Sequence, residues 1–229
     1  WNEDLNALPK QRQAASETRR LGLGVMGIAD MLNQLGVAYD SEQGTMMIEK
    51  VMEYITNASY QASTFIAKEK GASSIFDEKA YMECPFVKEA LSEQTHNMIR
   101  KNGLRNIAIM SIAPTGSISN IVLGYKSEEK NYIGVSGGVE PIFSTFYTRR
   151  SESFGNKMFK VFHSTIQAYI DKMGIQEDVD KAEDVDEVLP EFLTRTAHKI
   201  DSVKRVGVQG VIQRYIDHSI SSTINLPED

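Results

Sequence analysis

The segment from Leu104 to Asn120 constrains the fold more than any other part of the chain. Its first half, Ile107–Ala113, is short, apolar and without helical periodicity, which is typical of a buried strand. Its second half, Pro114–Ser119, contains one proline, one glycine and three hydroxyl residues. This composition predicts a turn with free backbone N–H groups, followed by a helix start that Ser or Thr caps.

A strand that leads through such a turn into a helix N-terminus is suited to bind phosphate. The N–H groups point outward, the helix dipole favours negative charge, and the hydroxyl groups add donors. The alternative is a strand followed by a capped helix without a ligand, because turns of this kind are common in α/β proteins. The residues of the turn leave both interpretations open.

The composition is that of a globular protein, with 229 residues of which 41% are hydrophobic and 24% charged. The formal net charge of -6 argues against a surface that coats a nucleic-acid polymer. No apolar run reaches the roughly 18 residues of a membrane span, so no membrane association is expected. The single cysteine, Cys84, fits a reducing, cytoplasmic setting, and the four scattered histidines predict no metal site.

Periodicity and breaker residues predict an α/β, helix-rich fold. Helices are expected over residues 16–36, 41–70, 77–103 (one or two, broken near Pro85), 156–173 and 203–217. Strands are expected over 107–113, 142–149 and 219–226, and 134–141 is a glycine-rich loop. The stretch 176–191 carries eight carboxylates and one lysine, so we expect an exposed acidic insertion or loop there.

The segment Gly22–Gly27 matches the pattern G-x-G-x-x-G of dinucleotide-binding folds. Such a site needs an apolar strand before the glycines and an acidic residue about 20 positions later. The preceding residues, Ser16–Arg20, are instead polar and helix-like. The sequence therefore predicts small residues in a helix that packs closely against a neighbour, because glycine in a helix costs about 1 kcal/mol relative to alanine.

Five segments, in order, resemble the C-terminal half of the catalytic (large) subunit of ribonucleotide reductase. They span nearly the whole chain, and their order makes the resemblance specific: Thr18–Leu32, Asn102–Asn106, Ala113–Ser119, Ser136–Pro141 and Tyr215–Pro227. The Pro-Thr-Gly-Ser turn and the Ser-Thr-Ile-Asn-Leu-Pro ending are most similar to the adenosylcobalamin-dependent (class II) branch. The branch with a separate radical-generating metal subunit is the alternative.

The resemblance implies a ten-stranded α/β barrel of the ribonucleotide reductase type. Residues 1–229 would form the C-terminal portion of this single catalytic barrel domain, with 176–191 as its acidic insertion. The turn at Pro114–Ser119 would bind the diphosphate of a ribonucleoside di- or triphosphate substrate through backbone N–H groups and hydroxyls. The implied site residues are Pro114, Thr115, Gly116, Ser117, Ile118 and Ser119.

The same resemblance implies chemistry that this chain does not carry alone. The family reduces ribonucleotides with a cysteine thiyl radical on an Asn-x-Cys-x-Glu loop, which lies upstream of the segment matching Thr18. Cys84 lacks that context, so we expect an incidental or structural thiol. No residue of this chain is predicted to be catalytic. Because the chain begins at Trp1 without Met, we expect a split or truncated subunit that is inactive alone.

The complete enzyme would need the N-terminal half of the subunit, adenosylcobalamin or a metal subunit, and a thioredoxin-like or glutaredoxin-like reductant. The second function considered is a non-enzymatic, mostly helical interaction domain with an anion-binding helix cap. An anion at residues 115–119 and an exposed apolar edge would favour the reductase, whereas a closed core without an anion would favour the interaction domain.

Overall fold

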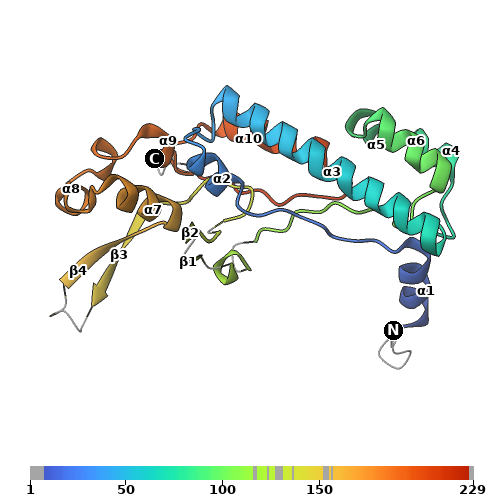
Figure 1. The fold of residues 1–229 in the computed structure, drawn as a ribbon, viewed down its shortest axis with the longest axis horizontal. Coiled ribbons are helices and arrows are strands. Elements are labelled where there is room, and N and C mark those ends of the chain that lie inside the picture. Colours follow the sequence, from blue (N-terminus) through green and yellow to red (C-terminus); the bar gives the residue numbers. More distant parts are fainter. Residues whose placement is uncertain are drawn as a thin grey trace. The chain divides into compact units, whose positions relative to one another are not determined.

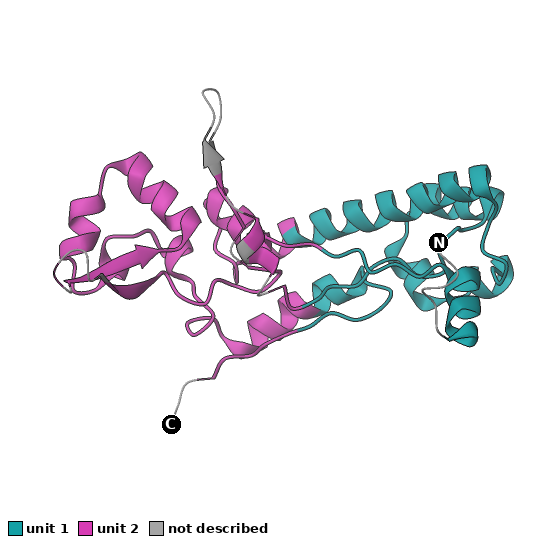
Figure 2. Cartoon of the chain, turned by 90° about the horizontal axis from the view of Figure 1, so that it is seen from below, with its two compact units in different colours: residues 1–24, 48–113, 210–221 teal, residues 25–47, 114–209, 222–229 magenta. Residues whose placement is uncertain are grey.

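The computed structural model describes residues 8–115, 118–122, 124–126, 131–135, 137–151, 155 and 157–226. The chain divides into two compact units, each assembled from three separated stretches of sequence (Figure 2). Unit 1 contains residues 1–24, 48–113 and 210–221. Unit 2 contains residues 25–47, 114–209 and 222–229.

Unit 1 is organised around three parallel extended segments. The central segment, 107–113, pairs on one side through Leu23 with Met110 and on the other through Ile112 with Ile220. Leu23 N–H donates to Ile109 O at 2.8 Å, and Ile112 N–H donates to the carbonyl of Ser219 at 3.1 Å. Ala108, Ile109, Met110 and Ile112 are buried, so the structure confirms the extended, buried segment predicted here.

The longest helix of the described chain is α3, Glu42–Lys70, which belongs to unit 1 from Ile48 onward (Figure 1). Ser41 Oγ accepts the Gly44 N–H at 3.0 Å and so caps its N-terminus. At the other end, Gly71 takes a left-handed φ of 84°. Both boundaries confirm the predicted helix over 41–70, and its inward face buries Ile48, Met52 and Tyr60.

Three short helices occupy the region 77–103, where one or two were predicted. They are α4 (Glu78–Met82), α5 (Pro85–Ala90) and α6 (Glu93–Asn102). The predicted break near Pro85 is confirmed, and Ser92 adds a second break. Ser92 Oγ accepts the Thr95 N–H at 3.3 Å and caps α6 as a separate helix.

The helix predicted over 16–36 is wrong. Helix α1, Pro9–Thr18, ends before the glycines, and α2, Ile28–Gln34, begins after them. A Cβ at Gly24 would lie 2.6 Å from the carbonyl oxygen of Ser111, and Gly27 has a φ of 78°. The glycines therefore permit close backbone pairing and a left-handed turn, and they do not lie in a helix.

Unit 2 contains α2, an antiparallel hairpin and a set of short helices. The hairpin joins β3, Phe146–Ser151, to β4, Lys157–Phe162, with Phe146 opposite Phe162. The short α-helices are α7 (Ser164–Met173), α8 (Gln176–Lys181) and α9 (Glu191–Thr194), and the first part of α10 (Ser202–Arg214) also belongs to this unit. Two 3-10 turns are η2 (Ile118–Ile121) and η4 (Val185–Glu187). A second antiparallel pair joins β1, Tyr125–Lys126, to β2, Asn131–Tyr132.

The helix predicted over 156–173 is correct only in its second half. The spacing of the apolar side chains in 157–162 fits both a helix and a strand. Because these residues pair with β3, they form the strand β4. The strand predicted over 142–149 begins only at Phe146. The last helix, predicted over 203–217, is α10, Ser202–Arg214. The strand predicted over 219–226 is reduced to a single bridge of Ile220 with Ile112, because the residues after it do not pair.

The acidic stretch 176–191, expected as an exposed insertion or loop, contains α8 and η4. Val179, Val185 and Leu189 are buried and attach the segment to unit 2. Lys160 Nζ of β4 donates to the carbonyls of Val179 and Ala182 at 2.8 and 2.7 Å. No helix in the described part of the chain is long and apolar enough to cross a membrane.

Candidate phosphate-binding site

The predicted phosphate-binding turn begins at Pro114. It follows residues 107–113, the central segment of unit 1, at the point where the chain enters unit 2. Thr115 adopts a left-handed φ of 59°, which is uncommon for a β-branched residue. Ser119 N–H donates to the carbonyl of Thr115 at 3.0 Å, and η2 follows as a single 3-10 turn where a longer helix was expected. Gly116 and Ser117 lie outside the described residues.

The donors of the described turn differ in availability. The N–H groups of Thr115 and Ile118 have no acceptor among the described residues, and Ile118 is 49% exposed. Thr115 Oγ1 instead donates to the carbonyl of Pro114 at 2.8 Å, and Ser119 is only 1% exposed. The geometry therefore favours backbone N–H groups over these two hydroxyls as donors to an anion.

The glycine-rich loop supports this turn. A Cβ at Gly138 would overlap Thr115 Oγ1 and lie 3.3 Å from the Pro114 carbonyl oxygen. The carbonyls of Gly137 and Gly138 also accept the N–H groups of Gly27 and Ile28 at 3.0 and 3.1 Å. Two N–H groups at the start of α2 therefore already have protein carbonyls as acceptors.

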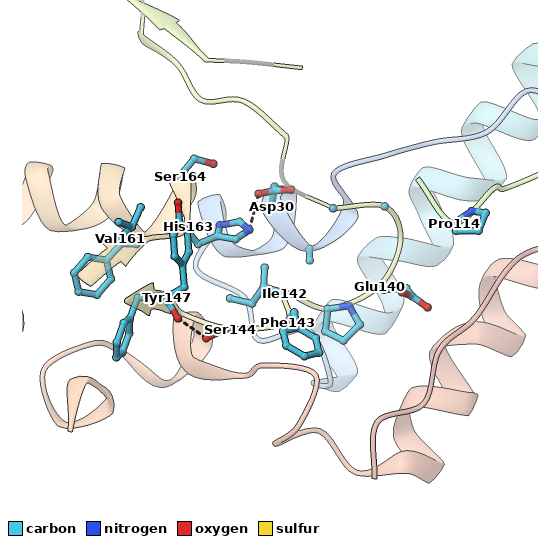
Figure 3. Close-up of a pocket in the computed structure, with 16 residues that line it drawn as sticks. Asp30, Pro114, Glu140, Ile142, Phe143, Ser144, Tyr147, Val161, His163 and Ser164 are labelled. Carbon is cyan, nitrogen blue, oxygen red and sulfur yellow. Dashed lines mark hydrogen bonds and ion pairs between the residues drawn. The ribbon is translucent and has the colours of Figure 1, made fainter. Parts of the chain in front are cut away.

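A cavity of about 570 Å³ adjoins the loop within unit 2 (Figure 3). Pro114, Gly137 and Gly138 line it on the side of the turn. Its apolar wall consists of Ile142, Phe143, Phe146, Tyr147, Val161 and Phe162. Its volume is in the range of about 300–1,000 Å³ that small-molecule sites occupy.

The polar side chains of this cavity include a carboxylate and a histidine. Asp30 Oδ1 accepts a hydrogen bond from Thr165 Oγ1 at 2.9 Å and lies 3.8 Å from His163 Nε2. Burial lowers the pKa of His163, although the Asp30 carboxylate acts in the opposite direction. His163 is therefore mostly neutral at pH 7. Neither residue is predicted as a site residue from the sequence, because the only local signal is an acidic residue among the mostly apolar buried positions of α2.

Two further side chains hold the backbone beside the loop. Tyr39 Oη donates to the carbonyl of Val139 at 2.8 Å, and burial raises the pKa of Tyr39 to about 12. Glu140 accepts hydrogen bonds from Arg205 Nη2 and from the Thr223 N–H. These contacts fix residues 139 and 140, directly after the glycine that supports Thr115.

The described residues contain no group of three or more His, Cys, Asp or Glu side chains placed to hold a metal ion. Cys84 is exposed and precedes α5. No described contact of Cys84 suggests a role in catalysis.

The family model described as "Ribonucleotide reductase, barrel domain" matches residues 3–229. A vitamin B12-dependent ribonucleoside-diphosphate reductase of Thermoplasma acidophilum is 30% identical over 99% of this chain, which covers 27% of that relative. The protein of the same name from Mycobacterium tuberculosis (strain H37Rv) is 28% identical over 96% of this chain and 28% of its own length.

A solved structure shares the fold. The Actinobacillus ureae class Id ribonucleotide reductase alpha subunit superposes with a TM-score of 0.65 at 22% identity, over 97% of this chain and 36% of that chain. The chain therefore spans only about a third or less of the length of these relatives. Because the family model covers almost every residue, the chain belongs to the ribonucleotide reductase barrel-domain family.

Proposed function

We propose that this chain supplies the substrate diphosphate-binding loop of a ribonucleotide reductase catalytic subunit. The complete subunit would reduce ribonucleotides to deoxyribonucleotides. The observation that carries the proposal is the turn at Pro114–Ser119, where the N–H groups of Thr115 and Ile118 have no acceptor among the described residues and follow a buried parallel segment. Family membership favours this function over a non-enzymatic interaction domain.

In this proposal the three parallel segments of unit 1 are consecutive strands of a larger, ten-stranded barrel. Each connection between them contains helices, as parallel strands require. Residues 1–229 then belong to one catalytic barrel domain whose remaining strands come from the N-terminal half of the subunit. Completion of the barrel would also pair the outer edges of this three-segment array.

The proposed contacts to the substrate are mainly backbone N–H groups. Thr115 and Ile118 provide two in the described turn, and Gly116 and Ser117 would provide others between them. The left-handed φ of Thr115 is the kind of backbone conformation in which successive N–H groups converge on one anion. The Ser117 hydroxyl remains a candidate donor. Those of Thr115 and Ser119 would maintain the shape of the loop.

The radical chemistry would come from outside this chain. Relatives named vitamin B12-dependent support adenosylcobalamin as the cofactor of the complete enzyme, which in the family supplies the initiating radical. The 570 Å³ cavity is too small for a complete corrin with its nucleotide arm, so we assign no residue of this chain to the cofactor. The reductant would be a thioredoxin-like or glutaredoxin-like protein.

Calorimetric titration of the chain with inorganic pyrophosphate and with CDP tests the loop. Ile118 is the first residue of η2, where proline fits the backbone and removes only the N–H donor. Ile118→Pro should therefore weaken binding at least about tenfold, the effect of losing one charge-assisted hydrogen bond. Ile118→Ala keeps the N–H and serves as the matched control. Equal affinities of the two variants would refute backbone recognition.

Reconstitution tests the larger function. The chain alone should show no conversion of CDP to dCDP, with or without adenosylcobalamin. Addition of an upstream chain carrying the Asn-x-Cys-x-Glu loop, together with cofactor and a dithiol reductant, should restore turnover. Turnover by the isolated chain would contradict the proposal.

A further inference from the structure

Arg205, in the unit 2 part of α10, is a buried cation with an incomplete set of hydrogen bonds. Its side chain is 4% exposed. Nη1 donates to Gln209 Oε1 and Nη2 donates to Glu140 Oε1, both at 3.3 Å. The buried Nε–H has no acceptor among the described residues. A buried charged group of this kind normally uses its N–H donors, because an unmet donor has lost its hydration without compensation.

Arg205 is one of the residues that line a small cavity of about 10 Å³. Polar residues Ser202, Thr223 and Asn225 line it together with Arg205, and Pro141 and Ile200 form part of its apolar wall. A water molecule needs roughly 10–15 Å³ of such volume and two to four polar partners. The cavity meets both conditions for one water and is too small for phosphate or a carboxylate.

We propose that this cavity is a specific hydration site, in which one water accepts the Arg205 Nε–H. The water would donate in turn to oxygen atoms of the surrounding polar residues. An adjoining pocket of about 190 Å³ shares Pro141, Ala197, Thr223 and Asn225 with it and gives solvent a path to the site. The water thus supplies the acceptor that the protein itself does not provide for Arg205.

The position of this water gives it a structural consequence. Glu140 accepts hydrogen bonds from both Arg205 Nη2 and the Thr223 N–H, so it links α10 to residues 222–225. The water would bridge the same two elements from the Nε–Nη2 edge of the guanidinium, the edge that also faces Glu140. Together they fix Glu140, two residues after Gly138. The hydration site is inferred from the surroundings of Arg205 and does not depend on the proposed function.

High-resolution crystal structures of the wild-type chain test the proposal. A density peak that refines as water should lie about 2.7–3.2 Å from Arg205 Nε. Crystals soaked in bromide should show no anomalous signal at this position. An anomalous peak would assign the site to an anion and overturn the proposal, and so would the absence of density beside a well-ordered Arg205.

The variant Ala197→Val provides a second measurement, because its methyl groups extend into the cavity from the apolar wall. We expect loss of the water peak and a lower thermal midpoint. Ala58→Val, at an exposed position of α3, is the control and should retain the peak, with its midpoint lowered only by the small helix-propensity cost of valine. A water peak that persists unchanged in Ala197→Val would overturn the assignment.

Discussion

Gly138 lies so close to Thr115 that a β-carbon at position 138 would overlap the threonine hydroxyl. This contact joins two segments that are 23 residues apart in the sequence, the phosphate-loop candidate and the glycine-rich loop. Both residues are mostly buried, and the carbonyl of Gly138 accepts an N–H from the start of α2. The shape of the candidate loop therefore depends on a position that has no side chain.

Replacement of Gly138 by alanine should destabilise the chain by about 1–3 kcal/mol, the usual cost of overpacking. Urea unfolding measures the effect. Gly137→Ala is the matched control, because no atom lies within 4 Å of a Cβ built there. The substitution Thr115→Ala removes the Oγ1 that the new Cβ would overlap. In that background, the loss of unfolding free energy caused by Gly138→Ala should be smaller than in the wild type by at least about 1 kcal/mol. Strict additivity of the two substitutions would contradict the contact.

Asp217 should be one of the most sensitive positions in unit 1. Its carboxylate accepts the N–H groups of Ile109 and Met110 at 2.7 and 2.8 Å, as well as the Tyr60 hydroxyl. Asp217→Ala leaves these donors without an acceptor and should cost about 2–5 kcal/mol of unfolding free energy. Glu89→Ala, at an exposed position of α5, is the control for loss of a carboxylate. A cost below about 1 kcal/mol would show that water replaces the carboxylate.

Removal of the Tyr60 hydroxyl tests the other side of the same contact. Tyr60 is fully buried and also receives a hydrogen bond from Tyr81 Oη at 3.2 Å. Tyr60→Phe should cost about 1–2 kcal/mol in denaturant unfolding, since it removes one donor and leaves the carboxylate bound to two amides. Tyr54→Phe, on a side chain 76% exposed, should leave stability unchanged. Equal effects of the two substitutions would argue against the hydrogen bond.

Stability should decrease at alkaline pH because tyrosines are buried in both units. Burial raises the pKa of Tyr39 from 10.0 to about 12 and raises that of Tyr60 in the same direction. A raised pKa in the folded state means that the stabilisation is complete below pH 10 and is lost as pH rises toward 12. Between these limits Tyr39 contributes a slope of up to about 1.4 kcal/mol per pH unit.

Urea unfolding between pH 8 and pH 11.5 measures this decrease, and Tyr39→Phe should make it shallower. Tyr54→Phe is again the control and should keep the wild-type slope. A flat profile up to pH 11.5 would show that the buried tyrosines ionise as they do in the unfolded chain.

The ion pair of Asp40 with Arg195 should make the folded state less stable as the pH falls into the acid range. Burial acts to raise the pKa of Asp40, but the hydrogen bonds and charge of Arg195 outweigh it and lower the pKa below 3.8. Arg195→Met should therefore destabilise unit 2 by about 3 kcal/mol at pH 7. The difference in stability between the wild type and Arg195→Met should shrink as pH falls below 3.8, because the Asp40 carboxylate of the wild type becomes protonated.

Unfolding monitored at pH 7 and pH 3 distinguishes this effect from a loss of packing. Arg100→Met, which removes an exposed partner of Glu93, is the matched control and should change stability by less than about 1 kcal/mol. A deficit of Arg195→Met that is independent of pH would assign it to packing.

Elements whose signals are local could be predicted from the amino-acid sequence. Ser41 and Gly71 mark the ends of α3 because a side-chain cap and a left-handed glycine act within one turn of the helix. The length of the apolar run 107–113 and its lack of helical period predicted a buried extended segment, and five ordered motifs were sufficient to indicate the family. The turn at Pro114–Ser119 was likewise evident from its residue types.

Features that depend on pairing between distant segments could not be predicted in this way and are visible only in the folded chain. Gly22–Gly27 fits a helix until Leu23 pairs with Met110, and residues 157–162 fit a helix until β3 lies beside them. The Asp30–His163 pair and the Glu140–Arg205 link join residues 133 and 65 positions apart in the sequence, which no local period reveals. Local interactions select among short-range conformations, whereas contacts between distant segments choose between conformations of similar energy.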